Sequence, residues 1–341
     1  MHTFLKSFMG TNRKALLLLL CSGAGLLISV GSGLCLGASP IGVPVFFDTL
    51  IRNDPDDFLY RIIMTVRLPR VFGALLAGSG LAVSGTIIQS VLNNPLASPN
   101  IIGVNAGAGF FVLLSSALFP AQSGLLPVSA FLGALLASML VLLAGAGSRM
   151  SQLLLVLTGF VINSIFSAGM NTIMILCPDA YVGAGNFLVG GLSSLTANAI
   201  AFPAVLILLG LMLAMLCSSG LNLLHLGAEC AKTLGMNILV SRCLYLAIAA
   251  VLAGSAVSFA GLIGFVGLLV PHGVKLLIGS DNRFVIPASA LMGGMFVILC
   301  DLLARTIFLP YELPVGILMS LIGSPFFLYL IFKNRRNGGK E

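Results

Sequence analysis

The stretch L-P-R-V-F-G-A-L-L-A-G-S-G-L-A-V-S-G-T-I-I, residues 68–88, decides the fold. After Arg70 it carries no charge, and a helix needs about 20 such residues to cross a bilayer. Further apolar runs of similar character occur at 15–37, 101–119, 125–146, 152–176, 199–217, 239–259, 261–277, 285–303 and 313–332. The sequence therefore predicts an all-α polytopic membrane protein of about ten transmembrane helices, which form a single domain over residues 1–341.

Composition excludes several classes of protein. Of the 341 residues, 58% are hydrophobic and only 8% are charged, so the chain cannot cover a water-facing surface with polar groups. The net charge of +7 is scattered between the apolar runs and does not form a basic patch, which argues against nucleic acid as a partner. We exclude a soluble enzyme, a DNA-binding domain and a secreted disulfide scaffold.

The distribution of basic residues predicts the topology. With ten spans, both termini lie on one side of the membrane, and the opposite side then carries only five of the 17 Lys and Arg residues: Arg52, Arg61, Arg67, Arg70 and Arg305. Basic residues favour cytoplasmic loops. We therefore expect both termini in the cytoplasm, a location in the cytoplasmic (inner) membrane, an external loop at 38–66 and a cytoplasmic loop at 218–238.

The cytoplasmic loop is amphipathic and is interrupted by Gly220, Gly227 and Gly235. It predicts two short helices at the membrane surface. Two interpretations remain open on this pattern, an interfacial segment that rests on lipid headgroups and a docking surface for a cytoplasmic partner.

The sequence has no phosphate-binding loop, no H-E-x-x-H motif and no His/Cys/acid cluster at metal-ligand spacing. We therefore expect no enzyme activity, no cofactor and no metal site in this chain. Any energy that the protein uses would come from an ion gradient or from a separate subunit. A gradient-driven carrier usually keeps carboxylates near the membrane midplane, and the apolar runs offer few.

One predicted span carries a polar stripe. Gly159, Asn163, Ser167 and Asn171 recur every four residues and share one helix face. Such a face either hydrogen-bonds to a neighbouring helix or lines a wet pathway, and the pattern alone does not separate the two.

Five motifs resemble the FecCD-type permease family of bacterial ABC importers, which take up iron-siderophore, haem and cobalamin complexes. They are R-L-P-R with G-S-G-L-A-V-S-G-T-I-I-Q (67–70 and 78–89), N-P-L-A-S-P-N-I-I-G-V-N-A-G-A (94–108), L-N-L-L-H-L-G-A-E-C-A-K-T-L-G (221–235), G-L-I-G-F-V-G-L-L-V-P-H (261–272) and L-P-V-G-I-L-M-S-L-I-G-S-P-F-F (313–327). The chain departs from the family pattern at Asn93 and Lys275, where arginine is common, and at Ser98, where aspartate is usual.

The resemblance implies the type II ABC importer permease architecture. It implies a second copy of the chain or a close paralogue, two cytoplasmic ABC ATPases that hold ATP and Mg, an extracytoplasmic substrate-binding protein and a metal-chelate substrate. The function expected is import of a ferric siderophore. The alternatives are import of haem or cobalamin within the family and, from another class, a gradient-driven secondary transporter.

The resemblance also suggests roles for particular residues. Arg67, Arg70 and Arg305, at external span ends, would dock the binding protein. The stripe Asn163, Ser167 and Asn171 would line the pathway, and Arg149, Met150 and Ser151 would close its cytoplasmic end. Coupling to the ATPase would fall to Leu223, Leu224, Leu226, Gly227, Glu229, Ala231, Lys232, Leu234 and Gly235.

Overall fold

The computed structural model describes residues 2–37, 39–145 and 152–337. These residues form helices and connecting turns, with no strand among them. In chain order the helices are α1 (His2–Cys35), α2 (Val43–Arg52), α3 (Phe58–Arg61), the π-helix η1 (Ile62–Arg67), α4 (Leu68–Val91), η2 (Pro99–Ile102), α5 (Val104–Leu118), η3 (Ser123–Leu125), α6 (Leu126–Gly145), α7 (Gln152–Leu176), α8 (Pro178–Val189), α9 (Ala197–Leu216), α10 (Ser218–His225), α11 (Ala228–Thr233), α12 (Ile238–Ala260), α13 (Val266–Ile278), α14 (Asn282–Ala304) and α15 (Val315–Asn337).

Each of the ten predicted spans corresponds to one helix, namely α1, α4, α5, α6, α7, α9, α12, α13, α14 or α15. Among the described residues, seven helices are long and apolar enough to cross a membrane, and three shorter apolar helices lie at 104–118, 266–278 and 315–328. The prediction of an all-α polytopic membrane protein is confirmed.

The segment predicted as an external loop is more helical than expected over its described residues, 39–66. Asp57 caps α3 by accepting a hydrogen bond from the backbone N–H of Leu59 at 3.0 Å, and the helix then runs without a break from Phe58 to Val91. The π-helix precedes Pro69, which has no N–H to donate to the preceding turn. A proline that would end an ordinary helix is thereby accommodated. α4 begins at its predicted boundary, but the continuous helix that contains it begins ten residues earlier, at Phe58.

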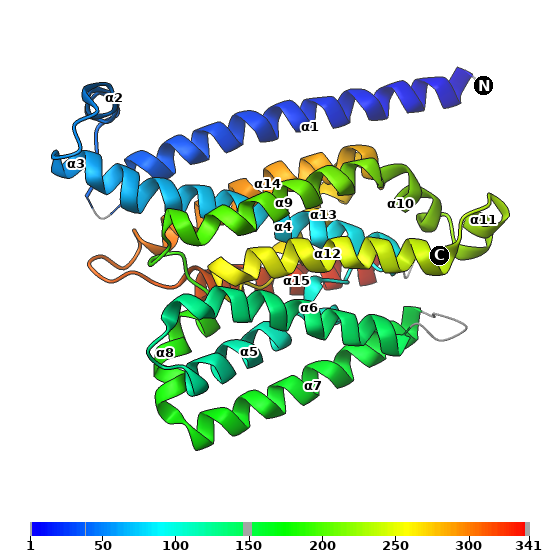
Figure 1. The fold of residues 1–341 in the computed structure, drawn as a ribbon. Helices are drawn as coiled ribbons and strands as arrows, with labels where there is room; N and C mark the ends of the chain where they lie inside the picture. The colour runs from blue at the N-terminus through cyan, green and yellow to red at the C-terminus, as the bar shows by residue number, and fades with distance from the viewer. Residues whose placement is uncertain (1, 38, 146–151, 338–341) are drawn as a thin grey trace.

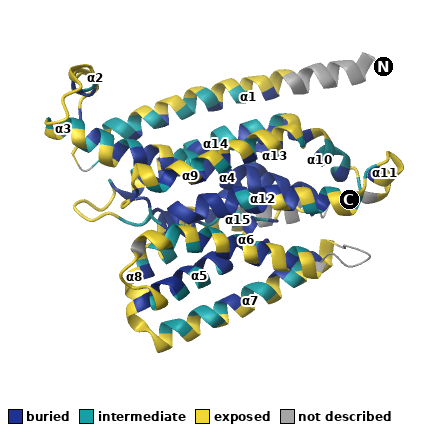
Figure 2. Cartoon of the chain, in the orientation of Figure 1, coloured by how far each residue is buried: buried dark blue, intermediate teal, exposed yellow. Residues whose placement is uncertain are grey.

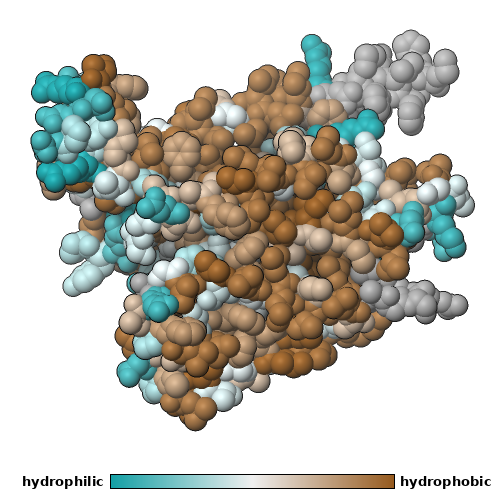
Figure 3. All heavy atoms as spheres, in the orientation of Figure 1, coloured by the Kyte–Doolittle hydropathy of each residue, from teal (hydrophilic) through white to brown (hydrophobic). Residues whose placement is uncertain are grey.

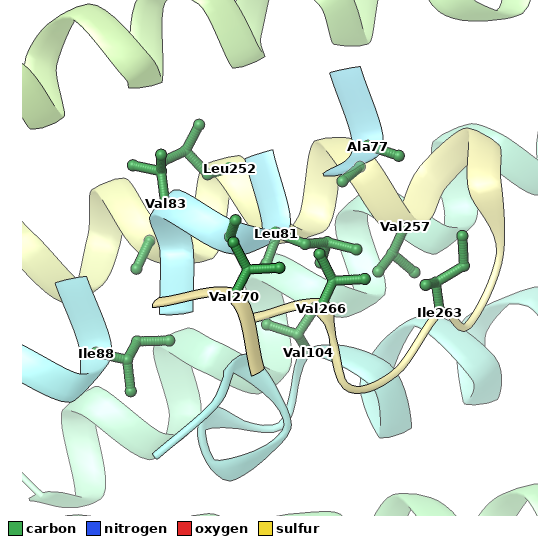
Figure 4. Packing of buried hydrophobic residues seen from close by; sticks show 14 of the residues in the cluster. Ala77, Leu81, Val83, Ile88, Val104, Leu252, Val257, Ile263, Val266 and Val270 are labelled. Carbon is green, nitrogen blue, oxygen red and sulfur yellow. The ribbon is translucent and has the colours of Figure 1, made fainter. Parts of the chain in front are cut away.

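The core lies around α4 and α12. In these two helices 83% and 78% of the most apolar window is buried, against 17% in α1 and in α7, so buried residues gather at the centre and exposed ones on the outer helices (Figure 2). Ala77 and Leu81 of α4 lie close to Val257 of α12 and Val266 of α13 (Figure 4). A wide exposed apolar surface remains on the outside, as expected where lipid replaces water.

Small residues allow the central helices to cross closely. A Cβ atom on Gly85 of α4 would overlap the carbonyl of Gly267 of α13, and one on Gly78 would overlap the carbonyl of Gly293 of α14. Backbone therefore packs against backbone at both crossings, as is common between membrane helices.

The molecule has two polar ends and an apolar middle (Figure 3). We call them the α2 end, with α2, α3 and residues 305–314, and the α10 end, with α10 and α11. The start of α1 and the end of α15 both lie at the α10 end (Figure 1). The first and last described helices thus have these ends on one side, as an even number of spans requires.

Candidate functional site: two polar ends of a helical bundle

A cluster of charged side chains is buried at the α2 end. Arg70 of α4 donates from Nε to both carboxylate oxygens of Asp301 of α14, at 3.0 Å each, and from Nη1 to Oε2 of Glu312 at 2.8 Å. Arg305 Nε lies 3.6 Å from Asp301 Oδ2. Arg70, Asp301 and Arg305 are 6%, 1% and 4% exposed, so the charges compensate one another where water is excluded.

The same end holds the C-terminus of α1. Arg67 donates to the carbonyls of Leu34 at 2.7 Å, Cys35 at 3.0 Å and Ser39, while Arg305 Nη2 donates to the Gly33 carbonyl at 2.6 Å. These carbonyls include the last ones of α1, which have no partner within their own helix, and cations are favourable there. Two of the three arginines therefore attach α1 to the bundle.

A cavity of about 540 Å³ opens at this end. Arg70 and Glu312 form part of its wall, together with Ser193, Ser194 and Thr196 from the segment between α8 and α9. The side chain of Glu312 is 39% exposed, whereas that of Arg70 is 7% exposed. Of the two acids that pair with Arg70, Glu312 is thus the accessible one and Asp301 the buried one.

The structure brings the predicted docking residues Arg67, Arg70 and Arg305 to one end, but it buries all three. Sequence reasoning missed Asp301 and Glu312 as their partners. The spacing of Asp301 and Arg305, four residues apart on one helix, is a signal that could have found one of the pairs. Arg70 and Asp301 are 231 residues apart, and no local pattern joins them.

At the α10 end the predicted coupling residues divide into two sets. Leu226 and Leu234 are 67% and 65% exposed, and Glu229 and Lys232 are also exposed. Leu224 and Ala231 are buried, at 4% and 0% exposed, and Leu223 is partly buried against the core.

The glycines of this segment differ as well. Gly227 and Gly235 have φ of +110° and +86°, a backbone conformation that glycine adopts without strain. Gly220, predicted as an interruption, lies inside α10. The absence of a side chain at this position leaves room for the hydroxyl of Tyr245. Leu224 and Ala231 face inward, so they do not present the anchors that we expected of them.

The polar stripe of α7 also divides. A Cβ on Gly159 would overlap the Ile101 carbonyl of η2, and Asn163 Nδ2 donates to the Asn100 carbonyl at 2.8 Å. Ser167 is partly buried and Asn171 is exposed. The first half of the stripe is thus a contact between α7 and η2, and Asn171 is the exposed residue among the four. The predicted gate residues Arg149, Met150 and Ser151 lie outside the described residues.

The described residues bring no three His, Cys, Asp or Glu side chains together at metal-ligand distance. Their polar chemistry is concentrated at the two ends. A bundle of apolar helices with a charged cavity at one end and exposed helices at the other defines a multi-pass membrane protein with two distinct polar surfaces.

The chain belongs to the FecCD transport family, whose model matches residues 25–333. It is 38% identical over 309 residues to the Fe(3+)-citrate import system permease protein YfmD of Bacillus subtilis (strain 168), covering 91% of this chain and 92% of that protein. It is 35% identical to the hemin transport system permease protein HmuU of Yersinia pestis, covering 89% and 92%.

A solved structure has the same fold. An inward-facing conformation of a metal-chelate type ABC transporter superposes with a TM-score of 0.83 at 30% identity, covering 92% of this chain and 98% of that chain. These relatives are transport permeases, and the resemblance read from the five sequence motifs is confirmed.

Proposed function

We propose that this chain is the membrane permease subunit of an ABC importer that carries a ferric chelate into the cell. The observation that carries the proposal is the family match over residues 25–333, together with ten helices that superpose on a metal-chelate transporter over 92% of the chain. ATP hydrolysis belongs to a separate subunit in this scheme.

The two polar ends suggest how partners divide between them. An external binding protein would dock at the α2 end, which holds Arg67, Arg70 and Arg305. Two carboxylates, those of Asp301 and Glu312, form ion pairs with Arg70 and Arg305 there. Glu312 is the accessible one of the two acids that pair with Arg70. An acidic group of the binding protein would therefore compete with Glu312 for the guanidinium of Arg70.

The ATPase would dock at the α10 end. Exposed Leu226 and Leu234 would provide the apolar anchors, and exposed Glu229 and Lys232 would set the register by charge pairing. A second copy of the chain, or a close paralogue, would complete the pathway between two bundles, with Asn171 and Ser167 of α7 on the pathway face.

Ferric citrate and haem both occur as substrates in the names of the relatives. We therefore propose a ferric chelate as the substrate class, with haem as the alternative. The short neutral polar groups of α7 would suit a bulky chelate, because a conduit must release what it binds.

Uptake by intact cells tests this function. Deletion of the gene should abolish uptake of one ⁵⁵Fe-labelled class among ferric citrate, ferric hydroxamate and haem, and the wild-type gene should restore it. After reconstitution with its ATPase, transport should require ATP and persist when ion gradients are collapsed. Unchanged uptake of all three classes, or uptake that follows a proton or sodium gradient, would contradict the proposal.

A further inference from the structure

A second pocket, of about 250 Å³, opens at the α10 end between α4, α10 and α13. Most of its lining residues have polar side chains, and they come from the end of α4 and the turn after it, from α10 and from the end of α13 and the turn after it. The residues that concern us are Gln89, Asn93, Asn94, His225, His272 and Lys275.

Lys275 supplies a cation to this pocket. Its Nζ donates to Oε1 of Gln89 at 3.1 Å, and Gln89 is oriented for this contact because its Nε2 donates to the Leu268 carbonyl at 3.3 Å. An ammonium group has three N–H donors, and one of them is used in this contact.

Two imidazoles face the same pocket. Within the described part of the chain, Nδ1 of His225 and Nε2 of His272 are buried and have no hydrogen-bond partner. His272 is only 7% exposed. A buried polar atom without a partner costs on the order of 1–3 kcal/mol, and either imidazole can present an N–H on the nitrogen in question.

No acid of the described residues balances these donors. Ion pairs within 4.0 Å involve Asp48, Asp301 and Glu312, all at the α2 end. The nearby Asp281 accepts from Asn222 Nδ2 at 2.7 Å and from the backbone N–H of Arg283 at 3.0 Å, and it does not line the pocket. The pocket is therefore rich in donors and carries a positive charge.

We propose that this pocket binds a phosphate group, either inorganic phosphate or the headgroup phosphate of an anionic phospholipid. Its donors come from α10, from α13 and from the turn after α4, and all of them line one pocket, which suits an oxyanion that accepts several hydrogen bonds. The amide of Asn94 adds a further donor at the exposed mouth, because its Oδ1 is held by the N–H of Leu96 at 2.9 Å. The volume is several times the roughly 30 Å³ share of one water molecule.

Phosphate in this position joins α10 to α4 and α13. His225 is the last residue of α10, while Lys275 belongs to α13 and Gln89 to α4. The bound anion therefore fixes the helix that leads to Leu226 and α11. This inference concerns the chain's own pocket and does not rest on the proposed transport function.

A matched pair of asparagine variants tests the site. Asn94 and Asn237 are both exposed, lie at the α10 end and accept a backbone N–H through Oδ1, at 2.9 Å and 3.3 Å. Aspartate preserves that bond at either position, but Asn94→Asp places a negative charge at the mouth of the pocket. For the full chain in phosphatidylcholine nanodiscs, binding of inorganic phosphate should saturate. The affinity for phosphate should fall at least tenfold in Asn94→Asp and remain unchanged in Asn237→Asp.

The second measurement identifies the source of the phosphate. Native mass spectrometry of the chain from mixed phosphatidylglycerol and phosphatidylcholine should show a retained phosphatidylglycerol that Asn94→Asp releases, if a lipid is the occupant. A phosphate titration that depends on Asn94 without lipid retention identifies free phosphate. If neither phosphate nor phosphatidylglycerol distinguishes Asn94→Asp and Lys275→Gln from Asn237→Asp, the proposal is wrong.

Discussion

Asp301 is the carboxylate on which two buried arginines depend. It accepts from Arg70 at 3.0 Å and lies 3.6 Å from Arg305, and removal of one member of a buried ion pair costs about 3–5 kcal/mol. We expect Asp301→Asn to lower the free energy of unfolding in detergent by this amount. Asp48→Asn is the control, because its pair with Arg52 has side chains 57% and 71% exposed and is worth less than about 1 kcal/mol. Equal losses in both variants would contradict the prediction.

His225 should make the attachment of α10 depend on pH. Burial, and secondly the charge of Lys275, lower the pKa of His225 below its usual value of 6.5. The unfolded segment therefore binds the proton more readily, so stability falls as pH drops below 6.5 towards the lowered pKa. Hydrogen exchange of α10, corrected for intrinsic rates and measured in phosphate-free buffer, should show protection that declines over this range.

The matching variant is His225→Asn, which cannot take up a proton. Its α10 should lose protection less steeply with falling pH than that of the wild type. A slope as steep as in the wild type would show that another group is responsible.

At the scale of the element, α7 offers a comparison within one helix. Asn163 donates to the Asn100 carbonyl at 2.8 Å, whereas Asn171 is exposed. Asn163→Leu should cost about 0.6 kcal/mol, the average for a hydrogen bond between membrane helices, as measured by unfolding in detergent. Asn171→Leu should leave stability unchanged and reduce chelate uptake, because the proposed pathway face loses its polar group. Normal uptake in a correctly assembled Asn171→Leu transporter would exclude that face as the pathway.

The element α11 carries its own reporter of ATPase docking. Cys230 is an exposed residue of α11, and Cys177 is an exposed residue at the opposite end of the bundle. If α11 docks the ATPase, labelling of Cys230 by a polar maleimide should slow at least tenfold on assembly, while labelling of Cys177 stays constant. Equal rates at both cysteines with and without the ATPase would favour a segment that rests on lipid headgroups.

At the scale of the whole molecule, the bundle depends on the close approach of α4 to its neighbours. A Cβ on Gly85 would overlap the Gly267 carbonyl, whereas a Cβ on Gly31 of α1 meets nothing within 4 Å. Overpacking costs about 1–3 kcal/mol and more where backbone must move, so Gly85→Ala should lower the yield of folded protein in size-exclusion chromatography. Gly31→Ala should behave as wild type, and an equally stable Gly85→Ala would show that α4 and α13 can separate.

The sequence alone determined the class of protein and the number of membrane helices, since both follow from the local hydrophobicity of consecutive residues. Its family motifs were equally readable, because they are runs of neighbouring residues. The tertiary structure alone decided the partners of Arg70 and the grouping of His225, His272 and Lys275. These contacts join residues from different helices, and helix packing, which depends on the shapes of whole surfaces, brings them together. Burial of Leu224 and exposure of Leu226 were decided in the same way. Two nearby leucines are equally hydrophobic in the sequence, and only the packing of neighbouring helices covers one of them.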